Sequence, residues 1–165
     1  MDFHMKLPRS GKDFVIFLLI VSLISVNTIG PTITMYQMGF SLETWKMTLK
    51  VLPFIWIAVV ILVLLTHPIA EKMTQNFLSE GDSFNATLTV NILFNVFLMS
   101  ISMTIIGTWI GMGQISWLPF QTFHINWPRN FAIAFAIEAL VAQPIARQVL
   151  FMMHKRQDAQ AVAED

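Results

Sequence analysis

Four long apolar stretches constrain this sequence more than any other feature, because each is long enough to form a helix that crosses a lipid bilayer. They lie near residues 14–36, 47–66, 88–110 and 131–151. A hydrocarbon core of about 30 Å needs roughly 20 apolar residues in a helix. Hydrophobic residues make up 55% of the chain and charged residues only 12%, which is far from globular usage. We therefore predict an all-α polytopic membrane protein with four transmembrane helices in contact with the lipid bilayer.

The basic residues gather on one side of this predicted membrane domain. The positive-inside rule places such residues in the cytoplasm, so we predict a multi-pass protein of the cell (plasma) membrane with both termini cytoplasmic. The first stretch is expected to remain as a span, because it exceeds the roughly 7–15 apolar residues of a signal peptide. The basic residues assigned to the cytoplasmic side are Lys6, Arg9, Lys12, Lys72, Arg147, Lys155 and Arg156, against Lys46, Lys50 and Arg129 elsewhere.

The second half of the chain repeats the first. When His67 is laid on Gln143, the segment His67-Pro-Ile-Ala70 matches Gln143-Pro-Ile-Ala146, and Ala58 falls on Ala134. A shared Pro-Ile-Ala at the same helix end is more specific than shared apolar residues. We predict two tandem two-helix membrane repeats, residues 1–80 and residues 81–165, the second with a short polar C-terminal tail. Because each repeat crosses the membrane twice, the two helical hairpins are parallel, and one chain lacks the inverted repeat of many transporters.

The segment from Phe131 to Arg147 carries a resemblance to a known family. It reads FAIAFAIEALVAQPIAR, and the weaker first copy ends in THPIAEK, from Thr66 to Lys72. Together with the opening segment Lys6 to Phe14, these residues resemble the bacterial membrane family called domain of unknown function 2798 over nearly the whole chain. The resemblance implies a bacterial inner-membrane protein built from two tandem copies of a two-helix module. It implies no activity, because none is established for the family.

Glu138 is the outstanding candidate for chemistry, because a carboxyl group well inside a span costs about 2.5–3.5 kcal/mol on insertion scales. An acidic residue can stand at this place in the family, whereas the first copy has Leu62 there. Small residues at steps of four surround Glu138 and predict close helix contact, with the carboxyl group turned into the bundle. These predicted packing residues are Ala134, Ala142 and Ala146 around Glu138, and Ala58 and Ala70 on the equivalent face of the second span.

Depth in the membrane indicates partners for Glu138. At 1.5 Å per residue, Glu138 lies about 12 Å inward from Asn130, and Asn27 lies about 20 Å outward from Phe14. These levels nearly coincide in a core of about 30 Å. We therefore predict a candidate buried polar cluster of Glu138, Asn27, Thr28 and Thr104. It is either a proton or cation relay or a neutral carboxyl group that joins helices, and the absence of an evident second buried charge favours the second interpretation.

The third span carries Gly107 and Gly111, a small-xxx-small pattern that predicts helix packing either within one chain or between chains. The chain has no cysteine. No nucleophile triad, phosphate-binding glycine loop or metal-binding cluster is evident, so we predict no enzyme, no cofactor and no metal site. Lys and Arg number 10, as do Asp and Glu, and this balance gives no reason to expect nucleic acid as a partner.

These observations favour a noncatalytic membrane module, an accessory or scaffold component that forms a homo-oligomer or binds another membrane protein. The alternative is a small proton-coupled exporter that uses Glu138, by analogy with small multidrug-resistance transporters. Those transporters also have four helices and an intramembrane glutamate, but theirs lies in the first helix. Because inverted repeats are lacking within one chain, such an exporter would need two copies in opposed orientations.

Overall fold

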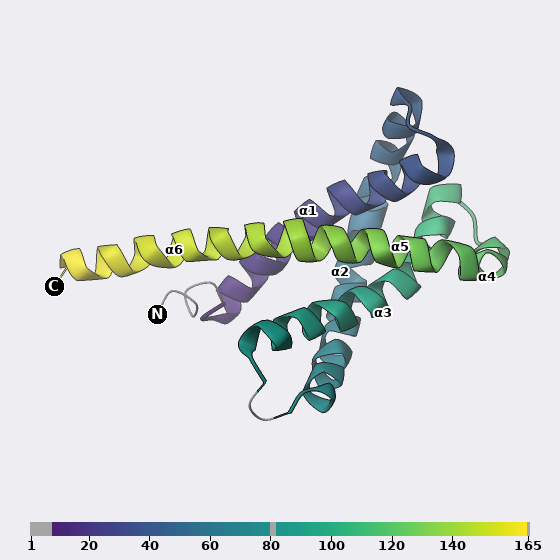
Figure 1. The fold of residues 1–165 in the computed structure, drawn as a ribbon. Helices are drawn as coiled ribbons and strands as arrows, with labels where there is room; N and C mark the ends of the chain where they lie inside the picture. The colour runs from purple at the N-terminus through teal and green to yellow at the C-terminus, as the bar shows by residue number, and fades with distance from the viewer. Residues whose placement is uncertain (1–7, 80–81, 165) are drawn as a thin grey trace.

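The computed structural model describes residues 8–79 and 82–164, and in this part of the chain every long element is a helix. Figure 1 shows the fold. The long helices are α1 (Gly11–Met38), α2 (Leu42–Phe77) and α3 (Phe84–Met112), followed by the short α4 (Leu118–Gln121). The last part of the fold is α5 (Phe123–Ile137), a π-helical turn (Glu138–Ala142) and α6 (Gln143–Glu164).

The predicted all-α class and four spans are confirmed. Over the described residues, four helices are long and apolar enough to cross a membrane: Gly11–Met38, Leu42–Phe77, Ala86–Met112 and Phe123–Ala159. The last of these, which we call the fourth span, runs without a break through α5, the π-helical turn and α6. The second helix has 36 residues, or about 54 Å at 1.5 Å per residue, so its hydrogen-bonded turns continue well beyond a hydrocarbon core of about 30 Å.

Local sequence signals explain where the long helices begin and end. Ser10, Ser41 and Ser83 precede α1, α2 and α3, and each side chain accepts a hydrogen bond from the backbone N–H three residues later. Such serine caps satisfy donors that have no partner inside the helix. Gly39 (φ +94°) and Gly113 (φ +67°) follow α1 and α3, where a positive φ favours glycine.

The spans contact one another in a ring. α1 packs against α2 and against the fourth span, and α3 packs against α2 and the fourth span. α2 and the fourth span have no close backbone contact within the described residues. In Figure 1 the fourth span is one long rod, drawn from green to yellow, which α1 crosses near its middle. The crossing point lies at the π-helical turn and the start of α6, both of which contact α1.

Small residues form the closest contacts of the fourth span. Ala142 and Ala146 are fully buried against Val21 of α1. Ala134 is buried with Ile92 and Val96 of α3. Small side chains let two helix backbones approach closely, which is how helices associate in lipid. In α2, Ala70 is fully buried and Ala58 is half-buried.

Many other apolar side chains of the spans are exposed on the surface. Leu23 is 56% exposed, Leu64 65% and Leu140 76%. A protein in water could not leave so much apolar surface uncovered, whereas lipid chains solvate it.

The predicted boundary between the two repeats, at residues 80 and 81, and Lys6 of the predicted basic N-terminus lie outside the described residues.

Candidate functional site

The fourth span contains a π-helical turn that begins at Glu138. The backbone N–H of Gln143 donates to the carbonyl of Glu138, five residues earlier. Pro144 follows directly, and a proline has no N–H to donate and a ring that clashes with the carbonyl four residues before it, here Leu140. The wider turn relieves this clash. Pro68, which the predicted repeat aligns with Pro144, lies instead inside an uninterrupted α-helix. The backbones of the two helices therefore differ at these two prolines.

Glu138 joins the fourth span to α1. The Ser25 hydroxyl of α1 donates to Glu138 Oε2 at 2.5 Å, and the Gln143 side-chain amide donates to Oε1 at 3.3 Å. Both carboxyl oxygens therefore have a partner. Because π-helical turns within α-helices are found frequently at functional sites, and because an acidic side chain in a span is costly, Glu138 is the centre of the candidate site.

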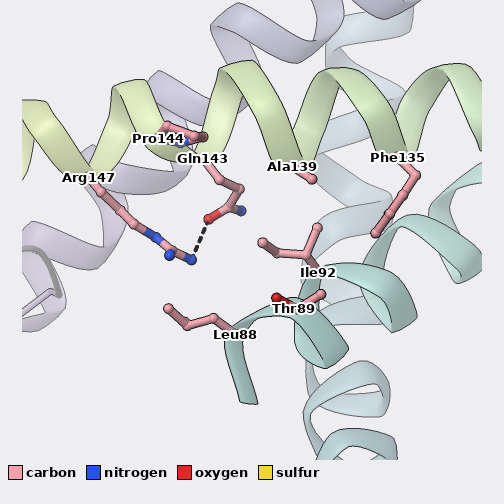
Figure 2. Close-up of a pocket in the computed structure, with 8 residues that line it drawn as sticks. All are labelled: Leu88, Thr89, Ile92, Phe135, Ala139, Gln143, Pro144 and Arg147. Carbon is pink, nitrogen blue, oxygen red and sulfur yellow. Dashed lines mark hydrogen bonds between the residues drawn. The ribbon is translucent and has the colours of Figure 1, made fainter. Parts of the chain in front are cut away.

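The hydrogen bonds continue from Glu138 to a cationic side chain. The Arg147 guanidinium donates through Nη2 to Gln143 Oε1 at 3.1 Å, the interaction drawn as a dashed line in Figure 2. Gln143 thus uses its amide nitrogen toward Glu138 and its amide oxygen toward Arg147. The result is one continuous polar chain, Ser25–Glu138–Gln143–Arg147, which we call the polar chain.

A cavity lies beside the polar chain, between α3 and the fourth span. Its volume is about 180 Å³. Figure 2 shows Gln143 and Arg147 extending from the fourth span toward Leu88 and Thr89 of α3. Glu138 is not among the lining residues, because its carboxyl group faces α1. The lining residues are Leu88, Thr89, Ile92, Phe135, Ala139, Gln143, Pro144 and Arg147.

The structure does not bring the predicted cluster together. Asn27 is exposed and its amide donates to the Leu23 carbonyl at 2.7 Å, while the Thr28 hydroxyl donates to the Ile24 carbonyl at 2.6 Å. These bonds stay within α1. Depth alone gave the prediction, but residues two apart on a helix are separated by about 200° around its axis. Ser25 therefore faces Glu138 when Asn27 faces away.

Thr104 belongs to a different contact, between α3 and α5. The Asn130 side-chain amide donates to Thr104 Oγ1 at 3.2 Å, and both residues are buried. One turn earlier on α3, Ser100 accepts a hydrogen bond from Trp127 Nε1 at 3.0 Å. These bonds hold the N-terminal half of the fourth span against α3.

No described residue of another helix lies within 4 Å of a Cβ added at Gly107 or Gly111 of α3. A Cβ added at Gly107 would meet only Met103 of the same helix, at 3.4 Å, and a Cβ at Gly111 would meet nothing within 4 Å. Packing within the chain therefore does not require either glycine. Among the described residues, no three His, Cys, Asp or Glu side chains lie close enough together to hold a metal ion.

A second polar contact, which the sequence did not predict, lies at the N-terminal end of α1. His154 of α6 is fully buried, and its Nε2 lies 3.2 Å from Asp13 Oδ2. Asp13 also accepts the backbone N–H groups of Arg9 and Ser10, each at 3.0 Å. Nearby, Arg9 forms an ion pair with Asp158 at 3.0 Å. A periodic signal for this contact was present: the buried stripe of Ala142 and Ala146 continues in steps of four through Leu150 to His154.

A similar signal points to Ser25. It stands one turn after Val21, which is buried against the fourth span, so both residues share one face of α1.

Comparison with known proteins adds no site residue: the chain matches no protein-family model, no curated protein and no solved structure. The resemblance to the family called domain of unknown function 2798 stays a prediction from the residues.

Proposed function

We propose that this protein is a noncatalytic module of the bacterial inner membrane, an accessory or scaffold component in which Glu138 fixes the fourth span to α1. One observation carries the proposal. Both oxygens of Glu138 are engaged by the protein itself, through Ser25 and Gln143, and the carboxyl group does not line the cavity. A carboxyl group that exchanged protons or cations with a substrate would need to face the substrate's path.

The energies of these contacts are consistent with a structural role. Placing a carboxyl group in a span costs about 2.5–3.5 kcal/mol. The interhelical hydrogen bond from Ser25 contributes about 0.6–1.7 kcal/mol, and the Gln143 amide of the same span satisfies the other oxygen, so these contacts offset part of that cost. Close packing of Ala142 and Ala146 on Val21 surrounds the site and keeps the helices near enough for the bonds to form.

Two polar contacts of α6 at the beginning of α1 support the proposed topology, with both termini in the cytoplasm. The pairs Arg9–Asp158 and Asp13–His154 hold the beginning of α1 beside the C-terminal half of α6, so both ends of the described chain lie on one side. The basic residues assign that side to the cytoplasm. Since the chain has no native cysteine, single cysteines at Ser79 and Thr122 test this directly. Membrane-impermeant labels should reach Ser79 only from inside and Thr122 only from outside, and the reverse pattern would contradict the topology.

Transport by purified protein in proteoliposomes tests the function. With a pH-sensitive dye inside and an imposed proton gradient, we expect no protein-dependent movement of protons coupled to cations or amines. The Glu138→Gln variant, which keeps the size of the side chain, should behave as wild type does. Helix content and gel-filtration behaviour are the controls for folding. Proton-coupled movement by wild type, lost in a folded Glu138→Gln variant, would contradict the module.

A second candidate, a small proton-coupled exporter, is favoured by one specific observation. The polar chain runs without interruption from Ser25 to Arg147, and Arg147 lines a cavity of about 180 Å³. A chain of hydrogen-bonded groups is a route along which a proton can move. For this candidate, Gln143→Leu should stop transport as completely as Glu138→Gln does, because it removes the connection between the carboxyl group and Arg147. Transport that survived Gln143→Leu would exclude the polar chain as the route.

A further inference from the structure

We propose that the cavity between α3 and the fourth span binds the phosphate group of an anionic phospholipid from the inner leaflet, with Arg147 as its cationic contact. This inference goes beyond the proposed function and takes from it only the proposed topology, with both termini in the cytoplasm. It rests on the charge of the cavity, the chemistry of its walls and its depth in the membrane.

Arg147 is a half-buried cation for which the described chain supplies no anion. Among the described residues, Arg9 forms an ion pair with Asp158, and the carboxyl group of Asp13 contacts His154. The hydrogen bond of Arg147 goes to the neutral amide of Gln143. A guanidinium has five N–H donors, and this bond uses one of them. Since a partly buried charge without a counterion is costly, an anion that enters the cavity gains a strong and otherwise unused partner.

The shape and charge of a guanidinium favour phosphate. Its planar fork binds phosphate oxygens through two parallel N–H bonds. Gln143 holds the guanidinium at the edge of the cavity, so less side-chain freedom is lost on binding than for a free surface arginine.

The walls of the cavity favour a lipid over a free anion. Leu88, Ile92, Phe135 and Ala139 are apolar and make up half of the lining. A free, hydrated phosphate would have to lose water against these side chains without compensation. The glycerol and upper acyl chain of a lipid would cover them favourably. One cation beside apolar walls therefore matches an anion that carries hydrocarbon.

The depth of the cavity in the membrane and its volume also favour a lipid headgroup. Leu88 lies four residues after Phe84, the first residue of α3, or about 6 Å along the helix. Arg147 lies seven residues before His154, which contacts the beginning of α1, or about 10 Å along the fourth span. Both positions are near the cytoplasmic headgroup layer, where basic pockets between helices bind anionic headgroups. A volume of 180 Å³ accommodates about six water molecules, so the cavity holds a headgroup fragment while the acyl chains remain in the bilayer.

Thermal unfolding of the full chain in nanodiscs tests the proposal. In discs of phosphatidylcholine, replacing part of the lipid by phosphatidylglycerol should raise the unfolding temperature in a saturable manner. Arg147→Gln should increase the phosphatidylglycerol fraction needed for half of this effect at least tenfold, and Arg147→Lys, which keeps the charge but not the fork, by a smaller factor. Arg156→Gln is the matched control, because it removes an exposed arginine of the same helix and should change nothing.

Three outcomes would overturn the proposal. The first is an equal loss in Arg147→Gln and Arg156→Gln, which would indicate general attraction to a charged surface. The second is equal protection by inorganic phosphate in phosphatidylcholine discs, which would assign the site to a free anion. The third is an outcome of a further variant, Leu88→Trp. This change fills the cavity and keeps Arg147, so it tests the site even if Arg147→Gln does not fold. We expect this variant to lose the protection, so full protection of Leu88→Trp by phosphatidylglycerol would place the lipid elsewhere.

Discussion

The contact between Ser25 and Glu138 can be measured as a coupling free energy by a double-mutant cycle. Ser25→Ala removes the hydroxyl that donates to Glu138 Oε2. Glu138→Leu removes the acceptor and introduces the residue that the predicted repeat aligns with it, Leu62. The double variant completes the cycle. The cycle isolates the pairwise interaction, provided that neither single change creates new contacts.

The cycle is needed because the single Glu138→Leu change combines two effects of opposite sign. Removing the carboxyl group from the span recovers about 2.5–3.5 kcal/mol, while losing its interhelical hydrogen bond to Ser25 costs about 0.6–1.7 kcal/mol and its bond to Gln143 is lost as well. The net change in the free energy of unfolding therefore says little about the contact. The coupling term contains only the Ser25–Glu138 interaction, and we expect about 1 kcal/mol.

Asn27 provides the matched control. It lies on the same helix, two residues from Ser25, at nearly the same depth, but it is exposed and bonded to the Leu23 carbonyl. Residues that do not touch have additive effects within about 0.3–0.5 kcal/mol. An Asn27→Ala and Glu138→Leu cycle should therefore give no coupling beyond that range.

Reversible unfolding in mixed detergent micelles, followed by circular dichroism, supplies the free energies for both cycles. A Ser25–Glu138 coupling below about 0.3 kcal/mol, or an Asn27–Glu138 coupling as large as the Ser25 value, would refute the reasoning. The second result would restore the cluster expected from depth alone.

The other predictions concern the π-helical turn, the contact of α6 with the beginning of α1, and the glycines of α3. Pro144→Ala removes the proline that causes the wide turn, so the Ser25–Glu138 coupling should fall below about 0.5 kcal/mol. Pro68→Ala is the control and should leave this coupling unchanged; equal effects of the two variants would show that Pro144 does not cause the turn. His154→Ala should lower the free energy of unfolding by about 1–3 kcal/mol, because it removes a fully buried partner of the α1 cap. Lys155→Ala, at the exposed neighbouring position, serves as the control. If His154→Ala lowers the free energy of unfolding no more than Lys155→Ala does, the contact contributes nothing. Gly111→Ala should not lower the unfolding temperature of the monomer, because a Cβ added there has no neighbour within 4 Å; a lower unfolding temperature would show closer packing on that face.

The sequence by itself determined everything that depends on distance along a helix. The four apolar stretches have the length of a membrane span, and the structure has four helices at those places. Glu138 stands inside the fourth of them. The serines before α1, α2 and α3 and the glycines after α1 and α3 mark helix ends through local hydrogen bonds and backbone angles. Each of these features depends on residues within a few positions of one another, so no knowledge of packing is needed to read them.

Only the tertiary structure decided what depends on rotation about a helix axis. Ser25, rather than Asn27, turns toward Glu138. The wide turn before Pro144 sets the direction of Glu138 and Gln143, and α2 passes Pro68 without such a turn. The same holds for the pairing of Asp13 with His154 across the bundle.

The physical reason is the solvent. In water, the apolar side of a helix marks its buried face, but in lipid the exposed side is as apolar as the buried one. On α1, Leu23 is 56% exposed and Val21 only 9%, although both are apolar and stand two residues apart. Hydrophobicity therefore gives the depth of a residue in this membrane protein, while its direction comes from small residues and polar pairs that are recognised only when the helices meet.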